Sequence, residues 1–113
     1  MSQITTHILD TSLGKPASGV KLILSRQIDT GWTELGAGTT DDDGRVSSLL
    51  DLNVTLPEGN YKLMFDVGSY YRTLDTPCFY PLVEIMFTIS GDGQHYHVPL
   101  LLNPFGYSTY RGS

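Results

Sequence analysis

Turn-forming residues recur along the whole chain and leave room only for short extended segments between them. Glycine, proline, asparagine and aspartate dominate these sites because they accept or impose the backbone angles that reverse a chain. The turns are Gly14-Lys15-Pro16, Asp29-Thr30-Gly31, Asp42-Asp43-Gly44, Pro57-Glu58-Gly59-Asn60, Gly91-Asp92-Gly93 and Asn103-Pro104. Their spacing of about 8 to 12 residues is typical of an antiparallel sandwich or barrel.

The segments between the turns predict an all-β fold of eight strands and one short helix. The predicted strands are Ile4 to Asp10, Val20 to Ile28, Trp32 to Thr39, Arg45 to Leu50, Tyr61 to Val67, Val83 to Ile89, His95 to Leu102 and Gly106 to Arg111. Several of them alternate apolar and polar residues, as half-buried strands do. The helix is predicted to open with Ser69 as its N-cap and to stop before Pro77.

Length and charge narrow the classes of protein that this chain can be. Its 113 residues fit a single domain over residues 1–113, and 40% hydrophobic with 17% charged residues is too apolar for a disordered segment. The net charge of −5 has the wrong sign for a phosphate backbone, so we expect no nucleic-acid partner. The single cysteine, Cys78, excludes both an internal disulfide and a zinc framework built on cysteines.

The opening residues, Met1-Ser2-Gln3-Ile4, lack the basic and apolar segments of a signal peptide. No apolar run approaches the ~20 residues of a membrane-spanning helix. We therefore expect no membrane association and a cytoplasmic protein, or a periplasmic one if a leader has been removed.

Two of the three histidines, His95 and His97, stand two positions apart on one predicted strand. They should project from one face while Tyr96 and Val98 enter the core. One interpretation is a solvated face with two incidental imidazoles. A second adds His7 and makes the three nitrogens a catalytic zinc centre, although nothing in the sequence fixes a fourth ligand.

His7 shares one face of the first predicted strand with Thr5 and Leu9, and Ile4 and Ile8 lie on the other. The alternation does not decide which face is buried, and taken alone it slightly favours an interior histidine.

Arg45 follows three aspartates and Gly44, a run that superficially suggests a calcium loop. The EF-hand pattern fails because counting back from Gly44 puts Thr39 first and Leu50 twelfth, where a glutamate is needed. A tight turn that starts a strand is the simpler interpretation. The guanidinium of Arg45 can hold a carbonyl or carboxylate, although an arginine at a strand end is more often solvated.

The last residues, from Tyr96-His97-Val98-Pro99 to Tyr110-Arg111-Gly112-Ser113, resemble the C-terminal signature of 5-hydroxyisourate hydrolases. These enzymes of purine breakdown share the transthyretin fold. The resemblance continues in Thr6-His7-Ile8-Leu9-Asp10, Gly14-Lys15-Pro16-Ala17 and Asp43-Gly44-Arg45, and so spans nearly the whole chain. Asn103 and Phe105 stand where the family more often has serine and tyrosine.

The resemblance implies an eight-stranded, two-sheet antiparallel sandwich with one short helix, which agrees with the turn pattern. It implies His7, Arg45, His97 and Ser113 as catalytic residues. Substrate-binding residues would be His7, Arg45 and Tyr110, with no metal and no cofactor, and His95 is not among the family's functional residues. The expected partners are the small-molecule substrate and further copies of the chain, in a homotetramer (a dimer of dimers) with sites at the dimer-dimer interface.

The implied reaction opens 5-hydroxyisourate to 2-oxo-4-hydroxy-4-carboxy-5-ureidoimidazoline in urate degradation. A neutral imidazole can remove the proton from an attacking water, and a guanidinium can stabilise the oxyanion that forms. The sequence does not assign the base between His7 and His97, nor decide between the hydroxyl and the terminal carboxylate of Ser113. The alternative function is a non-catalytic transthyretin-like carrier of a small planar ligand.

Overall fold

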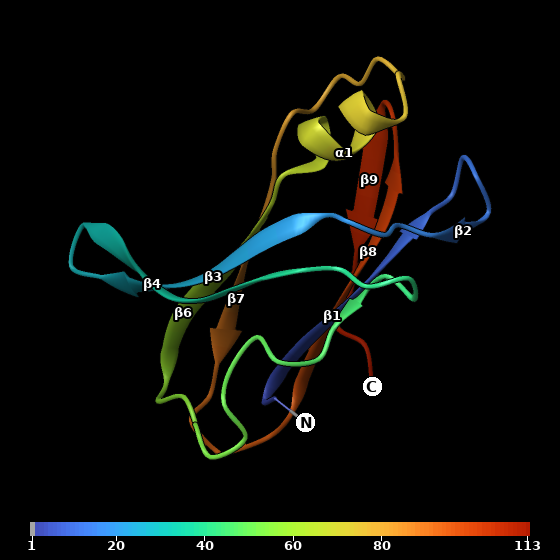
Figure 1. Ribbon diagram of the computed structural model, residues 1–113. Coiled ribbons are helices and arrows are strands. Elements are labelled where there is room, and N and C mark those ends of the chain that lie inside the picture. Colours follow the sequence, from blue (N-terminus) through green and yellow to red (C-terminus); the bar gives the residue numbers. More distant parts are fainter. Residues whose placement is uncertain (1) are drawn as a thin grey trace.

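The structure, a computed structural model, describes residues 2–113 (Figure 1). Nine strands and one helix follow one another within these residues. The strands are β1 (Ile4–Asp10), β2 (Lys15–Pro16), β3 (Lys21–Ile28), β4 (Gly31–Thr39), β5 (Arg45–Val46), β6 (Gly59–Phe65), β7 (Val83–Ile89), β8 (Tyr96–Asn103) and β9 (Gly106–Thr109). The helix α1 (Val67–Thr73) lies at one end of the molecule. No helix within residues 2–113 is long and apolar enough to cross a membrane.

The strands form two sheets. One sheet has the order β2-β1-β8-β9, with β5 also paired to β1, and the other has the order β4-β3-β6-β7. All strand pairs are antiparallel except β1 and β8, which run parallel from the pair Ile4 and Tyr96 to the pair Asp10 and Leu102. The first and eighth strands, which are far apart in sequence, therefore lie side by side in the middle of one sheet.

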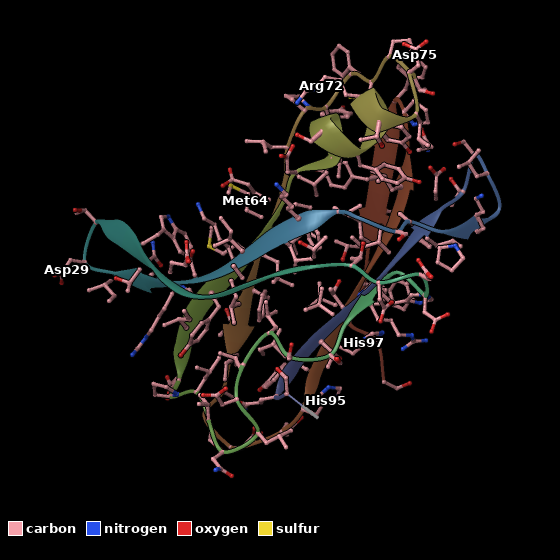
Figure 2. The ribbon with its side chains drawn as sticks, viewed as in Figure 1. Asp29, Met64, Arg72, Asp75, His95 and His97 are labelled. Atoms are coloured by element: carbon pink, nitrogen blue, oxygen red, sulfur yellow. The ribbon has the colours of Figure 1, made fainter. Side chains whose placement is uncertain are left out.

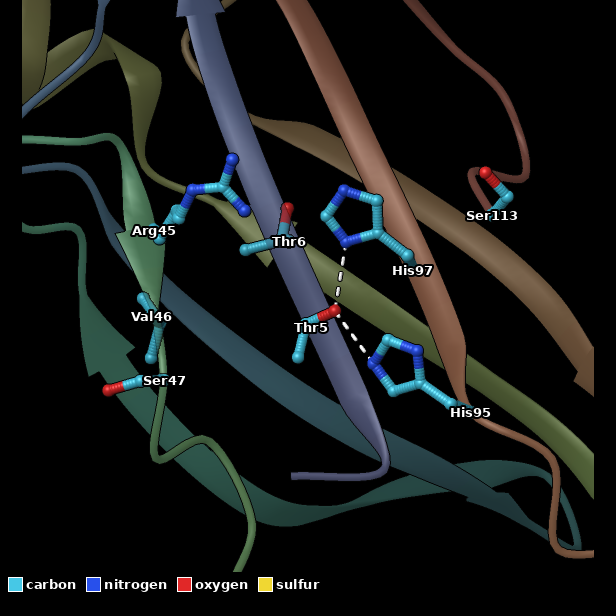
Figure 3. Close-up of a pocket in the computed structure, with 8 residues that line it drawn as sticks. All are labelled: Thr5, Thr6, Arg45, Val46, Ser47, His95, His97 and Ser113. Carbon is cyan, nitrogen blue, oxygen red and sulfur yellow. Dashed lines mark hydrogen bonds between the residues drawn. The ribbon is translucent and has the colours of Figure 1, made fainter. Parts of the chain in front are cut away.

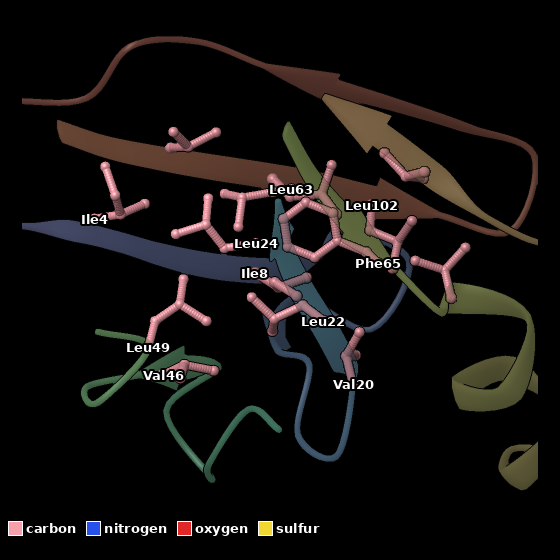
Figure 4. Packing of buried hydrophobic residues seen from close by; sticks show 14 of the residues in the cluster. Ile4, Ile8, Val20, Leu22, Leu24, Val46, Leu49, Leu63, Phe65 and Leu102 are labelled. Carbon is pink, nitrogen blue, oxygen red and sulfur yellow. The ribbon is translucent and has the colours of Figure 1, made fainter. Parts of the chain in front are cut away.

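Alternate residues of the central strands fill the space between the two sheets (Figure 4). The side chains that are at most 2% exposed include Ile4 and Ile8 of β1, Leu22 and Leu24 of β3, Leu63 and Phe65 of β6, and Leu100 and Leu102 of β8. Each aliphatic side chain removed from water in this way contributes about 1.5–3 kcal/mol to folding. This core fixes which face of β1 and β8 points outward.

The predicted two-sheet sandwich with one short helix is confirmed, and β1 and β7 have the predicted bounds. The strand count is nine because the unpredicted two-residue β2 also pairs with β1. The strand predicted over residues 45–50 is only two residues long, since the chain leaves the sheet after Val46 and buries Leu49 and Leu50 as a loop. One strand pair departs from the antiparallel pattern, because β1 and β8 run parallel.

The helix begins earlier than predicted. Asp66 is its N-cap, and its carboxylate accepts hydrogen bonds from the backbone N–H of Ser69 at 3.1 Å and from the Ser69 hydroxyl at 2.7 Å. The prediction of Ser69 as the N-cap is therefore wrong, because the aspartate three residues earlier supplies the acceptor that the first turn needs. The helix ends at Thr73, before Pro77, as predicted.

Candidate functional site

The outer face of β1 carries the first of the predicted site residues. Burial alternates along this strand, with Ile4, Thr6 and Ile8 turned into the core. His7 lies on the opposite, partly exposed face with Thr5. The slight preference of the sequence pattern for an interior histidine is thus wrong.

Two neighbouring strands add their residues to this outer face. β5 pairs with β1 so that Arg45 lies opposite His7, and β8 pairs with β1 so that His97 lies opposite Thr5. Partners in adjacent strands project from the same face of a sheet. The strand register therefore gathers a guanidinium and two imidazoles on one face, although they come from distant parts of the sequence.

A pocket of about 290 Å³ is hollowed in this face (Figure 3). Its lining consists of Thr5, Thr6, Arg45, Val46, Ser47, His95, His97 and Ser113. Three predicted site residues thus line one pocket: Arg45 from β5, His97 from β8 and Ser113 from the segment after β9. His7 is not part of this lining and stands beside Arg45 in the strand register.

The segment after β9 reaches the pocket by folding back onto β8. The backbone N–H of Gly112 donates to the carbonyl oxygen of His97 at 2.9 Å. A Cβ atom on Gly112 would lie only 2.6 Å from Cδ2 of His97, so the approach requires glycine at this position. This contact places Ser113 at the pocket and packs the chain against the His97 ring.

The surroundings of His97 favour its neutral form. Burial lowers the pKa of His97, and the positive charge of Arg45 lowers it further, followed by the charges of His95 and His7. A neutral imidazole keeps a free lone pair on one ring nitrogen. At neutral pH His97 is therefore equipped to accept a proton inside the pocket.

Thr5 and His95 also line the pocket, and the sequence did not indicate the contact that they make with each other and with His97. The hydroxyl oxygen of Thr5 lies 2.8 Å from Nδ1 of His97 and 2.9 Å from Nε2 of His95, both hydrogen-bond distances. His95 was set aside in the sequence as outside the family's functional residues. The alternation of β1 already placed Thr5 on the same face as His7, but it did not indicate that His95 and His97 lie beside Thr5.

Tyr110 lies in a second pocket. This pocket, of about 250 Å³, is lined by Ile85, Phe87, Thr88, Tyr96, His97, Val98, Thr109, Tyr110 and Arg111. His97 is shared by both pockets, but within one chain the structure does not bring Tyr110 to Arg45. The Tyr110 side chain is 59% exposed and is free to meet another molecule.

The three histidines do not form the zinc ligand set that the sequence left open. Across residues 2–113, no three or more histidine, cysteine, aspartate or glutamate side chains are grouped so that they can hold a metal ion. His95 and His97 instead share the hydroxyl of Thr5.

Comparison with known proteins identifies the family of this chain. The model of the HIUase/Transthyretin family matches residues 4–112. The chain belongs to this family. A 5-hydroxyisourate hydrolase of Salmonella dublin is 46% identical over 110 residues, which cover 97% of this chain and 80% of the relative.

Solved structures of the HIUase/Transthyretin family share the sandwich. The 5-hydroxyisourate hydrolase of Klebsiella pneumoniae superposes with a TM-score of 0.84 at 36% identity, over 97% of this chain and 98% of the other. Sea bream transthyretin, solved in complex with thyroxine, gives a TM-score of 0.91 at 33% identity, over 98% and 95%. The family resemblance found in the sequence is thereby confirmed.

Proposed function

We propose that the protein hydrolyses 5-hydroxyisourate to 2-oxo-4-hydroxy-4-carboxy-5-ureidoimidazoline, without a metal. The observation that carries the proposal is the single pocket that holds Arg45, His97 and Ser113 together. The relatives named 5-hydroxyisourate hydrolase, at 46% identity in Salmonella dublin, support the same reaction. Hydrolysis uses both the cation, Arg45, and the neutral base, His97, whereas a carrier that only binds its ligand needs no base.

The reaction adds water to a carbonyl carbon within a ring. The water oxygen forms a bond to that carbon, the carbon–nitrogen bond breaks, and the ring opens to a carboxylate while the nitrogen takes a proton. His97 removes the proton from the water, because its ring lines the pocket and its lowered pKa keeps it neutral. His7, opposite Arg45, orients the water or returns a proton to the leaving nitrogen.

Arg45 stabilises the negative charge that develops on the carbonyl oxygen. Its planar fork of N–H donors holds two oxygen atoms at once, and in a pocket this interaction is stronger than in water. Ser113 also lines the pocket and lies on the other side of His97 from Arg45, as Figure 3 shows, and it contributes its polar atoms to substrate or to the imidazole. Tyr110 contributes to substrate binding once subunits meet.

The active protein is a homotetramer, a dimer of dimers, with its sites at the dimer-dimer interface. The pocket opens on the outer face of a sheet, and Arg45 is exposed within one chain. A substrate of this size needs to be enclosed before electrostatic stabilisation becomes strong. A second subunit laid over the face supplies that enclosure and brings further residues to it.

A turnover assay tests the proposed reaction directly. Freshly generated 5-hydroxyisourate decays spontaneously, so its loss is followed by ultraviolet absorbance with and without the purified protein. We expect a catalysed loss that is unchanged when the protein is treated with a chelator. Activity that is lost on chelation and restored by zinc would contradict the metal-free mechanism.

The same assay separates the hydrolase from a carrier. The likeness to sea bream transthyretin in complex with thyroxine is the observation that keeps a carrier as the second candidate. No acceleration of the decay, together with tight binding of a planar aromatic ligand, would replace the proposed hydrolase by a carrier.

The pH dependence of the catalysed rate reports on the base. Protonation of His97 removes the lone pair that accepts the water proton, so activity falls as the pH drops through the pKa of that ring. Because burial and Arg45 lower this pKa, we expect the acidic limb of the kcat/KM profile to lie below the ordinary histidine value of about 6.5. Initial rates across a pH series measure the limb, and a midpoint above that value would contradict His97 as the base.

A further inference from the structure

A single hydroxyl group links two imidazoles at the pocket. The oxygen of Thr5 is 2.8 Å from Nδ1 of His97 and 2.9 Å from Nε2 of His95. The two rings are stacked with an interplanar angle of 18° and centroids 6.5 Å apart. Figure 3 shows the hydroxyl between them, with both rings turned toward it.

The number of protons on this hydroxyl limits how the link can be made. A threonine hydroxyl donates one hydrogen bond and accepts others, and a neutral imidazole has one N–H and one bare nitrogen. With both bonds formed, Thr5 donates to one histidine and accepts from the other. Either His97 carries its proton on Nδ1 and leaves Nε2 bare, or it carries the proton on Nε2.

The position of Arg45 favours the first arrangement. Figure 3 shows the second ring nitrogen of His97 turned away from Thr5, with the guanidinium of Arg45 on the same side of the pocket. Burial and, next to it, the charge of Arg45 lower the pKa of His97. A positive group attracts a bare lone pair and repels an N–H, so it stabilises the tautomer whose Nε2 is unprotonated.

We propose that Thr5 and His95 are positioning residues that fix the tautomer of His97. Nδ1 of His97 donates its proton to the Thr5 oxygen, and the Thr5 hydroxyl donates its own proton to Nε2 of His95. Nε2 of His97 is then held bare and faces the pocket, where it accepts the proton of the attacking water. The role in catalysis rests on the proposed function, whereas the hydrogen-bond order itself does not depend on it.

The spectrum of the unmodified protein is the first test. Long-range proton–nitrogen NMR spectra of protein labelled with ¹⁵N in histidine distinguish a protonated ring nitrogen from a bare one. We expect His97 at neutral pH to carry its proton on Nδ1, and His95 to have a bare Nε2. A proton on Nε2 of His97 would overturn the proposal, whatever the protein is found to hydrolyse.

Substitution of Thr5 is the second test. Thr5→Val keeps the branched shape that a strand favours and removes only the hydroxyl, so we expect mixed tautomers of His97 and a kcat lowered about tenfold with little change in KM. Thr5→Ser restores a hydroxyl and should restore kcat. A role of Thr5 in packing alone would not be rescued by serine, which restores the hydroxyl but not the branched shape. A kcat equal to that of the unmodified protein in Thr5→Val would overturn the proposal.

Removal of His95 tests the far end of the link. His95→Ala leaves Thr5 free to point its proton at solvent or at His97, so we expect a smaller fall in kcat, about severalfold, with the same mixing of tautomers. The matched control for Thr5→Val is Thr33→Val, which makes the same change at an exposed threonine on β4 of the other sheet. Unchanged tautomers and kcat in His95→Ala would remove His95 from the proposal.

The two ways of failing are distinguishable. If the unmodified protein does not accelerate the loss of 5-hydroxyisourate, the proposed function fails while the NMR result still decides the tautomer. If hydrolysis is observed and Thr5→Val matches it, only the positioning role fails.

Discussion

Replacing His97 with alanine is expected to lower kcat for 5-hydroxyisourate hydrolysis by at least about two orders of magnitude, the usual contribution of a positioned general base. The His97 ring lines both pockets of this region, and its Nδ1 lies at hydrogen-bond distance from the Thr5 hydroxyl. With alanine in its place, the pocket loses the imidazole that takes the water proton in the proposed mechanism. Initial rates at saturating substrate measure the loss.

The control for His97→Ala has to separate chemistry from packing, because Gly112 lies directly against the His97 ring. His97→Phe keeps an aromatic ring at this position and removes both nitrogens, so it should lose as much activity as His97→Ala while holding the segment after β9 in place. Partial recovery of His97→Ala on addition of free imidazole would identify proton transfer as the lost step. Turnover near that of the unmodified protein in either variant would exclude His97 as the base.

Much of the fold follows from patterns that are local in the sequence. The turns delimit the strands, and alternation separates Ile8 from His7 along β1 and Val98 from His97 along β8, although only the structure shows that the His7 face of β1 is the outer one. These patterns act within one strand, where side chains alternate between the two faces. They therefore fixed which residues can share a face, and the family resemblance indicated which of them form the site.

The pairing of distant strands is not local and was not predicted. Thr5 and His97 are 92 positions apart, and they meet only because β1 and β8 pair in parallel. That register depends on packing of the whole core, because a shift by one residue would turn every side chain to the other face. The link through Thr5 to His95 is a consequence of this register, so the sequence alone left both residues without a role.

The N-cap of α1 is a second feature that the sequence pattern did not place correctly. Figure 2 places Arg72 and Asp75 near the helix end, far along the molecule from His95 and His97. The predicted N-cap, Ser69, was wrong there because the cap is Asp66, three residues earlier, whose carboxylate accepts a hydrogen bond from the backbone N–H of Ser69. Serine and aspartate are both favoured at the N-cap position, so residue type alone does not decide between them.

Replacing Arg45 with alanine is expected to lower kcat/KM by at least about two orders of magnitude. The guanidinium is the cation of the pocket that holds His97 and Ser113, and the oxyanion would lose its charged donor. Folding should be preserved, because the side chain is exposed and the turn is held by the backbone N–H of Arg45, which donates to Oδ1 of Asp41 at 3.0 Å. Steady-state rates and a thermal melt measure the two effects.

Two companion variants make the result specific to the pocket. Arg72→Ala removes an exposed arginine from α1 and should leave the rate unchanged. Arg45→Lys keeps the positive charge but not the planar fork of donors, so its rate should fall between those of Arg45→Ala and the unmodified protein.

The pH profile of Arg45→Ala adds an independent signature. Because the charge of Arg45 lowers the pKa of His97, its removal raises that pKa, and His97 then stays protonated to higher pH. The acidic limb of the residual activity should therefore move upward in Arg45→Ala and remain near its original position in Arg45→Lys. An Arg45→Ala protein with nearly unchanged turnover and an unmoved limb would show that the guanidinium acts neither on the substrate nor on the base.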